Sequence, residues 1–112
     1  TSYRVILSRV YYAAFHVAQD FLIAHKLPVP EFGAEHEKII QAYKQMVKKD
    51  SDFQTECKKI GEKLRRLQIA RVDADYETEY TPTNAFVRVQ IKDSQNVVAS
   101  LAQLENTYFS KK

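Results

Sequence analysis

The chain has 112 residues, of which 45% are hydrophobic and 28% are charged, and its formal net charge is +3 at pH 7. This length predicts a single domain over residues 1–112, and this balance of residue types excludes an intrinsically disordered chain. No apolar run approaches the roughly 18 residues of a membrane-spanning helix, so we expect no membrane association. The single cysteine, Cys57, excludes an internal disulfide and predicts a reducing compartment such as the cytoplasm.

The first segment, from residue 2 to about residue 26, contains neither Gly nor Pro and has the periodicity of a helix. Its apolar side chains cover such a broad arc that we expect the helix to pack against at least two neighbours. These apolar residues are Tyr3, Leu7, Val10, Tyr11, Ala14, Phe15, Val17, Ala18, Phe21, Leu22 and Ala24. The remaining narrow polar stripe consists of Arg9, Tyr12, His16, Gln19 and Asp20.

The next segment, 27–33, is predicted to be a loop because Pro28 and Pro30 forbid helix there. A second, shorter helix is expected over residues 34–49. Its apolar side would consist of His36, Ile39, Ile40, Tyr43, Met46 and Val47. A turn should follow at 50–52, with Ser51 or Asp52 as the N-cap of the third helix.

The third predicted helix extends from this turn to at least residue 70. Its apolar stripe consists of Phe53, Cys57, Ile60, Leu64 and Leu67. Gly61 lies within it, although glycine costs about 1 kcal/mol relative to alanine in a helix. We therefore expect Gly61 to mark a close contact between helices, and residues 73–84 to be irregular.

The last segment begins with residues 86–92, where apolar and polar side chains alternate. This stretch is either an extended approach or a first helical turn, and a helix is predicted from about residue 93. Its apolar face would consist of Val97, Val98, Leu101, Leu104 and Tyr108. Four helices with short connections predict an all-α, antiparallel up-and-down four-helix bundle, with room for an extra short helix.

The most informative position for function is Arg71. It continues the apolar stripe of the third helix, where an arginine is costly to bury unless it is paired or faces a cleft. Two structural interpretations are open: the guanidinium reaches water at the helix end, or it pairs with Asp73 or Asp75. The functional interpretation is an arginine that binds phosphate. Lys63 and Arg66 would then belong to a basic patch that binds RNA or a nucleotide.

The polar stripe of the first helix offers a second candidate site. His16 follows Arg9 on the same helix face, and Asp20 lies one turn beyond His16. A histidine beside a carboxylate could act as an oriented acid or base, whereas the alternative is a polar network or a contact between subunits. His36 and Cys57 are predicted to be packing residues.

The carboxylates Asp73, Asp75, Glu77 and Glu79 are interpreted as a solvated acidic loop rather than a metal site. The sequence also lacks paired Cys or His ligands, a glycine-rich phosphate loop and a serine nucleophile elbow. We therefore expect neither a metal nor a cofactor.

Two segments resemble a known family. Ser8-Arg9-Val10-Tyr11-Tyr12-Ala13-Ala14-Phe15-His16 and Arg71-Val72-Asp73-Ala74-Asp75-Tyr76 are similar, in this order, to motifs of small prokaryotic HEPN proteins. The resemblance implies an antiparallel bundle of four or five helices that is usually a homodimer. Many members are metal-independent ribonucleases, commonly toxins paired with a nucleotidyltransferase antitoxin, or parts of antiviral defence systems.

The catalytic signature of such ribonucleases is an Arg followed, four to six residues later, by a His near the end of the third helix. No histidine follows Arg71 here; Asp75 and Tyr76 stand in its place, and the spacing Arg9 to His16 occurs instead in the first helix. The candidate catalytic set is therefore Arg71, Asp75, Tyr76 and His16. In some family members the tyrosine of this motif is modified by the partner.

Three functions remain open from the sequence. The first is a HEPN module that binds RNA, a nucleotide or a nucleotidyltransferase partner. The second is a metal-independent endoribonuclease. The third is a purely structural helical dimer, in which Arg9, Tyr12, His16 and Asp20 form the interface.

Overall fold

The computed structural model describes residues 2–76 and 82–110, and these are helical with no strand among them. The elements are α1 (Tyr3–Ala24), α2 (Glu35–Lys44), α3 (Ser51–Tyr76), α4 (Asn84–Leu104) and a short π-helical turn, η1 (Glu105–Phe109). The prediction of an all-helical fold is confirmed. None of the described helices is long and apolar enough to cross a membrane.

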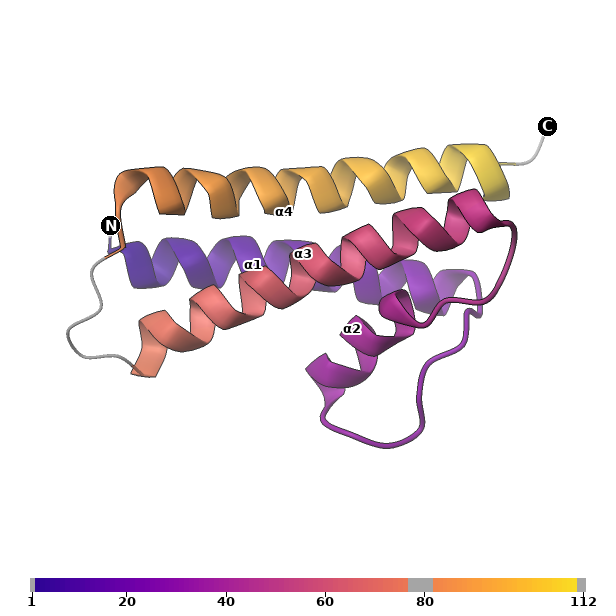
Figure 1. Ribbon diagram of the computed structural model, residues 1–112, viewed down its shortest axis with the longest axis horizontal. Coiled ribbons are helices and arrows are strands. Elements are labelled where there is room, and N and C mark those ends of the chain that lie inside the picture. Colours follow the sequence, from indigo (N-terminus) through magenta and orange to yellow (C-terminus); the bar gives the residue numbers. More distant parts are fainter. Residues whose placement is uncertain (1, 77–81, 111–112) are drawn as a thin grey trace.

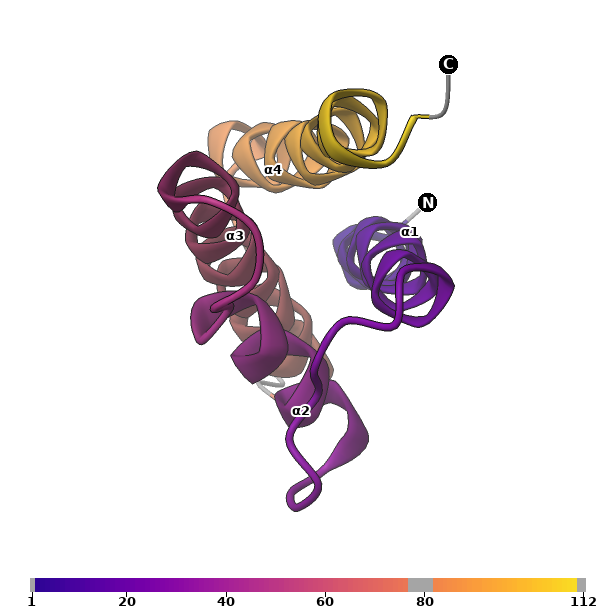
Figure 2. The ribbon, with the colours of Figure 1, turned by 90° about the vertical axis from the view of Figure 1, so that its right-hand side faces the viewer.

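The three long helices surround a common core, and α2 lies to one side against α3 (Figure 2). α1 and α4 run in the same direction, because Tyr3 bonds to Asn84 at their first turns and His25 bonds to Glu105 at their ends. α3 runs in the opposite direction to both (Figure 1). The strict alternation of direction that the sequence predicts for an up-and-down bundle is therefore not confirmed.

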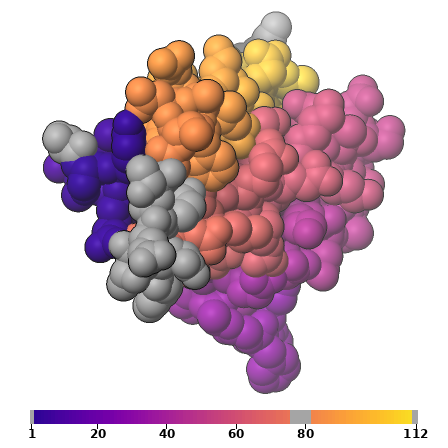
Figure 3. All heavy atoms as spheres, turned by 60° about the vertical axis from the view of Figure 1, so that its left-hand side comes forward, coloured from indigo at the N-terminus to yellow at the C-terminus, as the bar shows by residue number. Residues whose placement is uncertain are grey.

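The length of α2 accounts for this difference. It has 10 residues, about 15 Å at 1.5 Å per residue, whereas α1 has 22. A helix this short does not span the bundle, so the connection from α1 to α3 begins and ends at the same end of the molecule (Figure 1). The loop before α2 and the first turn of α2 project from the body of the protein (Figure 3).

Gly61 allows α2 to approach α3 closely. A Cβ atom at this position would lie 2.6 Å from Cγ of Lys44, 3.2 Å from the Lys44 nitrogen and 3.3 Å from the Ile40 carbonyl oxygen. These distances leave no space for a side chain. The close helix contact predicted at Gly61 is confirmed.

The ends of the helices differ from the predictions in ways that local hydrogen bonds explain. α3 is capped by Asp50, whose Oδ1 accepts from the Phe53 N–H at 3.0 Å, and not by Ser51 or Asp52. The prediction that α4 begins near residue 93 was too late, because Thr83 caps it and accepts from the Phe86 N–H at 3.0 Å. Residues 86–92 are thus helical rather than extended.

Two other boundaries also differ. α2 ends at Lys44 rather than near residue 49, and Lys49 has a left-handed backbone with a φ of 62°. As a result Val47 is 71% exposed, although Met46 is buried as predicted. α3 continues to Tyr76, so residues 73–76 are helical and not irregular; the rest of that predicted loop up to residue 81 lies outside the described residues.

The core follows the predicted apolar faces closely, with Tyr11, Tyr43 and Phe53 as its largest fully buried side chains. Val17 and Ala24 of the predicted α1 face are instead exposed. A smaller cluster forms where α1 begins and α3 ends. It consists of Leu7, Ala70 and Ala74.

The buried face of α4 also carries polar residues that the sequence analysis missed. These are Gln90, Asp93 and Ser94. The Ser94 hydroxyl donates to the Val10 carbonyl at 2.7 Å, which fixes α4 against α1.

Candidate functional site

The guanidinium of Arg71 packs against the two adjacent tyrosines of α1. Its central carbon lies 5.4 Å from the ring centroid of Tyr11 and 5.6 Å from that of Tyr12, within the range of cation–π attraction. The Arg71 side chain is 20% exposed, so it is largely enclosed yet still reaches the surface. Arg71 lies against α1 because α3 continues as a helix to Tyr76. A helix that ended at residue 70, the shortest predicted, would not hold Arg71 against α1.

Among the described residues, Arg71 has one hydrogen bond to a carboxylate, from Nη1 to Oδ2 of Asp75 at 3.0 Å. Its Nε is buried, and no described residue accepts a hydrogen bond from it. A buried N–H without an acceptor is unfavourable by about 1–3 kcal/mol. Pairing with Asp75, one of the predicted alternatives, is thus correct, but it leaves the guanidinium incompletely satisfied.

The second part of the site joins α1 to α2. The Tyr11 hydroxyl oxygen and Nδ1 of His36 lie 2.6 Å apart, and the Phe15 ring stacks on the His36 ring at 4.2 Å between centroids. The sequence analysis assigned His36 to packing alone and missed this contact. No local pattern reveals it, since the two residues lie 25 positions apart on different helices.

The surroundings determine how these two groups are protonated. Burial raises the pKa of Tyr11 to about 12, although the nearby positive charge of Arg71 opposes this. The pKa of His36 is lowered by burial first, then by the positive charge of Arg71 and by His16. At neutral pH Tyr11 therefore keeps its proton and His36 is uncharged. When Tyr11 donates to Nδ1, the ring proton of His36 lies on Nε2.

His16 extends the same group of side chains to the surface. It is exposed, and its ring stacks on Tyr12 with 5.8 Å between centroids. The structure shows no hydrogen bond between His16 and Asp20, which is also exposed, so the predicted acid–base pair is not formed between them. The Tyr12 ring that His16 stacks on also lies against the His36 ring and the Arg71 guanidinium.

An ion pair holds α2 beside this group. Arg65 donates from Nη1 and Nη2 to the two carboxylate oxygens of Glu37, at 2.7 and 2.5 Å. Hydrogen bonds from Arg65 and Gln41 lower the pKa of Glu37 to about 2. Because Glu37 directly follows His36, this pair fixes the position of His36, and the sequence analysis did not identify it.

The structure does not place Arg66 with Arg71. Arg66 donates from Nε and Nη2 to Asp93 of α4, at 3.1 and 3.2 Å, whereas Arg71 contacts α1. The two arginines are five positions apart, about 140° around a helix. Lys63 is half-buried on α3. A role for Arg66 and Lys63 in binding RNA stays a prediction.

The other predicted residues are distributed as follows. Arg9 is exposed on α1, and Asp75 is exposed on the last turn of α3. Tyr76 is the final residue of α3, but its side chain lies outside the described part of the chain, as do Glu77 and Glu79. Within the described residues, no group of three or more His, Cys, Asp or Glu side chains could hold a metal ion.

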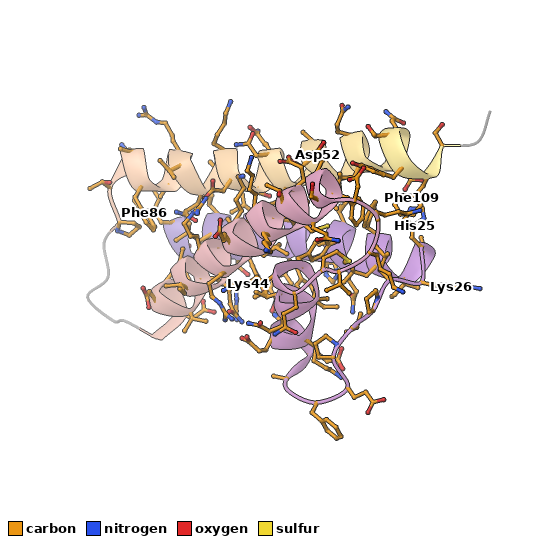
Figure 4. All side chains as sticks on the ribbon, turned by 45° about the vertical axis from the view of Figure 1, so that its right-hand side comes forward. His25, Lys26, Lys44, Asp52, Phe86 and Phe109 are labelled. Atoms are coloured by element: carbon orange, nitrogen blue, oxygen red, sulfur yellow. The ribbon has the colours of Figure 1, made fainter. Side chains whose placement is uncertain are left out.

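The third histidine, His25, lies at the other end of α1. Its ring stacks on Phe109 of η1 at 3.7 Å, and its Nε2 lies 2.6 Å from Oε1 of Glu105 (Figure 4). His25 therefore belongs to the contact between α1 and the C-terminal turn. It is separate from the group around Arg71.

No family model, curated protein or solved structure matches this chain. The resemblance to HEPN proteins thus depends on the two sequence motifs. The structure brings these motifs into contact, because the first contains Tyr11, Tyr12 and His16 and the second contains Arg71 and Asp75. We call this group, together with His36, the Arg71 cluster.

Proposed function

We propose that this chain is a HEPN-type domain of a prokaryotic toxin–antitoxin or defence system, and that it binds a phosphate of RNA or a nucleotide at Arg71. The observation that carries the proposal is the Arg71 guanidinium itself. It reaches the surface, its buried Nε has no acceptor among the described residues, and histidine and tyrosine side chains from two other helices lie around it. Such an arrangement suits an anion that brings several oxygen acceptors.

Phosphate would have to compete with Asp75 for the guanidinium. The side chain of Asp75 is 33% exposed, and the pair joins residues four positions apart on one helix. Ion pairs of this kind contribute only about 0.3–0.5 kcal/mol. A bidentate arginine–phosphate contact is stronger, so exchange of Asp75 for phosphate is favourable.

Binding of a fluorescent single-stranded RNA, followed by anisotropy, tests the proposal. Arg71→Gln should weaken binding about 10-fold or more, because a hydrogen-bonded charge contact contributes roughly 1.5–3 kcal/mol. It should also reduce the slope of log affinity against log salt concentration by about one, which is the contribution of one phosphate contact. Arg88→Gln is the matched control, since it removes the same charge from an exposed position on α4. Equal affinities for wild type and Arg71→Gln reject the proposal.

A second candidate function is metal-independent cleavage of RNA at the same cluster, which is favoured because His16, His36 and Arg71 all lie against the Tyr12 ring. Cleavage through the 2′-hydroxyl needs a group that takes its proton, a donor for the leaving oxygen, and positive charge near the phosphorane. His16 would take the proton and Arg71 would stabilise the charge. Asp75 and Tyr76 remain alternatives as proton donors.

Incubation of the purified protein with RNA in EDTA tests this second function. The expected result is cleavage by wild type and loss of cleavage in both Arg71→Ala and His16→Gln. His25→Gln, which changes the distant histidine, should cleave normally. Absence of cleavage by wild type excludes the ribonuclease, and leaves a module that only binds.

We also propose that the domain forms a homodimer and works with a nucleotidyltransferase partner, as the HEPN motifs imply. The alternative is a purely structural module, in which the polar stripe of Arg9, Tyr12, His16 and Asp20 is the dimer interface and does not bind RNA. His16→Glu should then yield a monomer in light scattering. For the partner, co-purification with the product of a neighbouring nucleotidyltransferase gene is expected, and an isolated gene argues against it.

A further inference from the structure

A hollow of about 350 Å³ adjoins the Arg71 cluster where α1 begins and α3 ends. Its lining consists of Arg4, Val5, Ser8, Arg9 and Asp75. Asp75 connects the hollow to the cluster, because the same carboxylate accepts the hydrogen bond from Arg71. Asp75 therefore borders both the hollow and the Arg71 cluster.

The hollow is positively charged. Arg4 is held in place by a hydrogen bond from its Nε to the Ala74 carbonyl at 2.5 Å. Arg9 is exposed, and no carboxylate of the described residues pairs with it or with Arg4. Among the described residues, the hollow is thus lined by two arginines, Arg4 and Arg9, and by one acidic residue, Asp75, which also pairs with Arg71. This excess of positive charge, beside the Ser8 hydroxyl, suits an anion.

We propose that the hollow binds the phosphate adjacent to the one at Arg71, so that consecutive phosphates of one RNA strand occupy the two sites. This inference rests on the proposed function and specifies its substrate as a strand at least two phosphates long. Arg9 supplies the charge in the second site, and Ser8 supplies a hydroxyl donor. A single strand suits this pair of sites, whereas proteins contact a duplex across successive grooves.

Affinity as a function of oligonucleotide length tests the inference. Calorimetry would compare uridine monophosphate with uridine oligonucleotides of two and three phosphates, for wild type, Arg9→Gln, Arg71→Gln and the control Arg88→Gln. Wild type and Arg88→Gln should gain about 10-fold or more in affinity from the first phosphate to the second. Arg9→Gln should lose this gain but bind the mononucleotide normally, and Arg71→Gln should bind all three ligands weakly.

The outcomes separate this inference from the proposed function. If Arg9→Gln keeps the full gain while Arg71→Gln binds weakly, the second site is wrong and the function stands. If wild type binds none of the ligands, both are wrong. Inorganic pyrophosphate distinguishes a strand from a nucleoside polyphosphate: an Arg9-dependent affinity for pyrophosphate, without a gain for the oligonucleotides, overturns the assignment to RNA. Tighter binding of a duplex than of a single strand overturns it as well.

Discussion

The Tyr11 hydroxyl oxygen and Nδ1 of His36 lie 2.6 Å apart, and this contact joins the buried face of α1 to the first turn of α2. This contact matters because α2 touches α1 only lightly and packs mainly on α3. Tyr11 also lies under the guanidinium of Arg71. One buried phenol of α1 therefore contacts both α3, which carries the candidate phosphate-binding arginine, and α2, which carries His36.

Tyr11→Phe removes only the hydroxyl of this pair. We expect the free energy of unfolding to fall by about 0.5–1.5 kcal/mol, since the hydrogen bond is lost while the ring still fills the core. Urea denaturation measures the change. Tyr12→Phe is the control, because no hydrogen bond of its hydroxyl is seen among the described residues, and it should change stability little. Identical effects of the two substitutions contradict this account of the Tyr11–His36 pair.

His36 predicts a dependence of stability on pH. Its pKa in the folded protein is lowered from the ordinary 6.5, so the unfolded chain binds the proton more readily. The stability that neutral His36 provides is present above pH 6.5 and is lost as the pH falls from 6.5 towards the lower folded pKa. The free energy of unfolding of His36→Gln should change less over this interval than that of wild type. Parallel pH curves for the two proteins would falsify the prediction.

Glu37 produces a separate loss at lower pH. Its pKa is lowered to about 2, so the stability from the Arg65 pair is lost as the pH falls from 4.5 to about 2. Arg65→Gln should reduce this second decline, of which the hydrogen-bonded Asp50 supplies another part, and leave the decline below pH 6.5 intact. A decline below pH 4.5 of the same size in Arg65→Gln and wild type is the contrary result.

The pair of Arg66 and Asp93 predicts an effect on stability. The Asp93 side chain is 10% exposed, whereas that of Arg66 is 53% exposed. Arg66→Gln leaves a buried carboxylate without its partner and should lower the free energy of unfolding by about 1–3 kcal/mol. Addition of Asp93→Asn should restore part of the loss. The RNA affinity of Arg66→Gln tests the predicted role of Arg66 in binding: a loss greater than that of the Arg88→Gln control supports this role, and equal affinities reject it.

Gly61 provides a test of the helix packing. Alanine is intrinsically better in a helix by about 1 kcal/mol, but the added Cβ would meet Lys44 at 2.6 Å. We expect Gly61→Ala to lower stability by a net 1–3 kcal/mol or so, because the backbone of α2 must move away. Glu62→Ala, an exposed neighbour, controls for the change in helix propensity. If Gly61→Ala instead raises the free energy of unfolding, α2 can move away from α3 at little cost.

The all-helical fold and most of the core residues can be predicted from the sequence, because the spacing of apolar residues within each helix indicates its buried face. Tyr11, Phe15 and Leu22 lie on the face that their spacing predicts. Asp93 illustrates what periodicity misses: its burial depends on Arg66, which lies 27 positions earlier on another helix. The parallel direction of α1 and α4 was missed for a related reason, since nothing local reveals that α2 is too short to cross the bundle.

The candidate site was predictable only in part. Arg71 stood out because a charged residue continued an apolar stripe, but the sequence left Asp73 and Asp75 both open as partners, and the continuation of α3 to Tyr76 selects Asp75. The contact of His36 with Tyr11 could not be predicted from the sequence, because it depends on the path of the loop that brings α2 back beside α1. Arg4 had no sequence signal either, because its position depends on the carbonyl of Ala74 at the far end of α3.

The three histidines allow the most direct test of the Arg71 cluster as the place where RNA binds. Two of them, His16 and His36, lie at the cluster, and His25 lies against Phe109 at the opposite end of α1. NMR signals of the histidine rings can be recorded during titration with a short single-stranded RNA. The account predicts that the signals of His16 and His36 shift together while that of His25 stays in place. Saturable binding with unchanged His16 and His36 signals would place the RNA elsewhere on the protein and contradict the account.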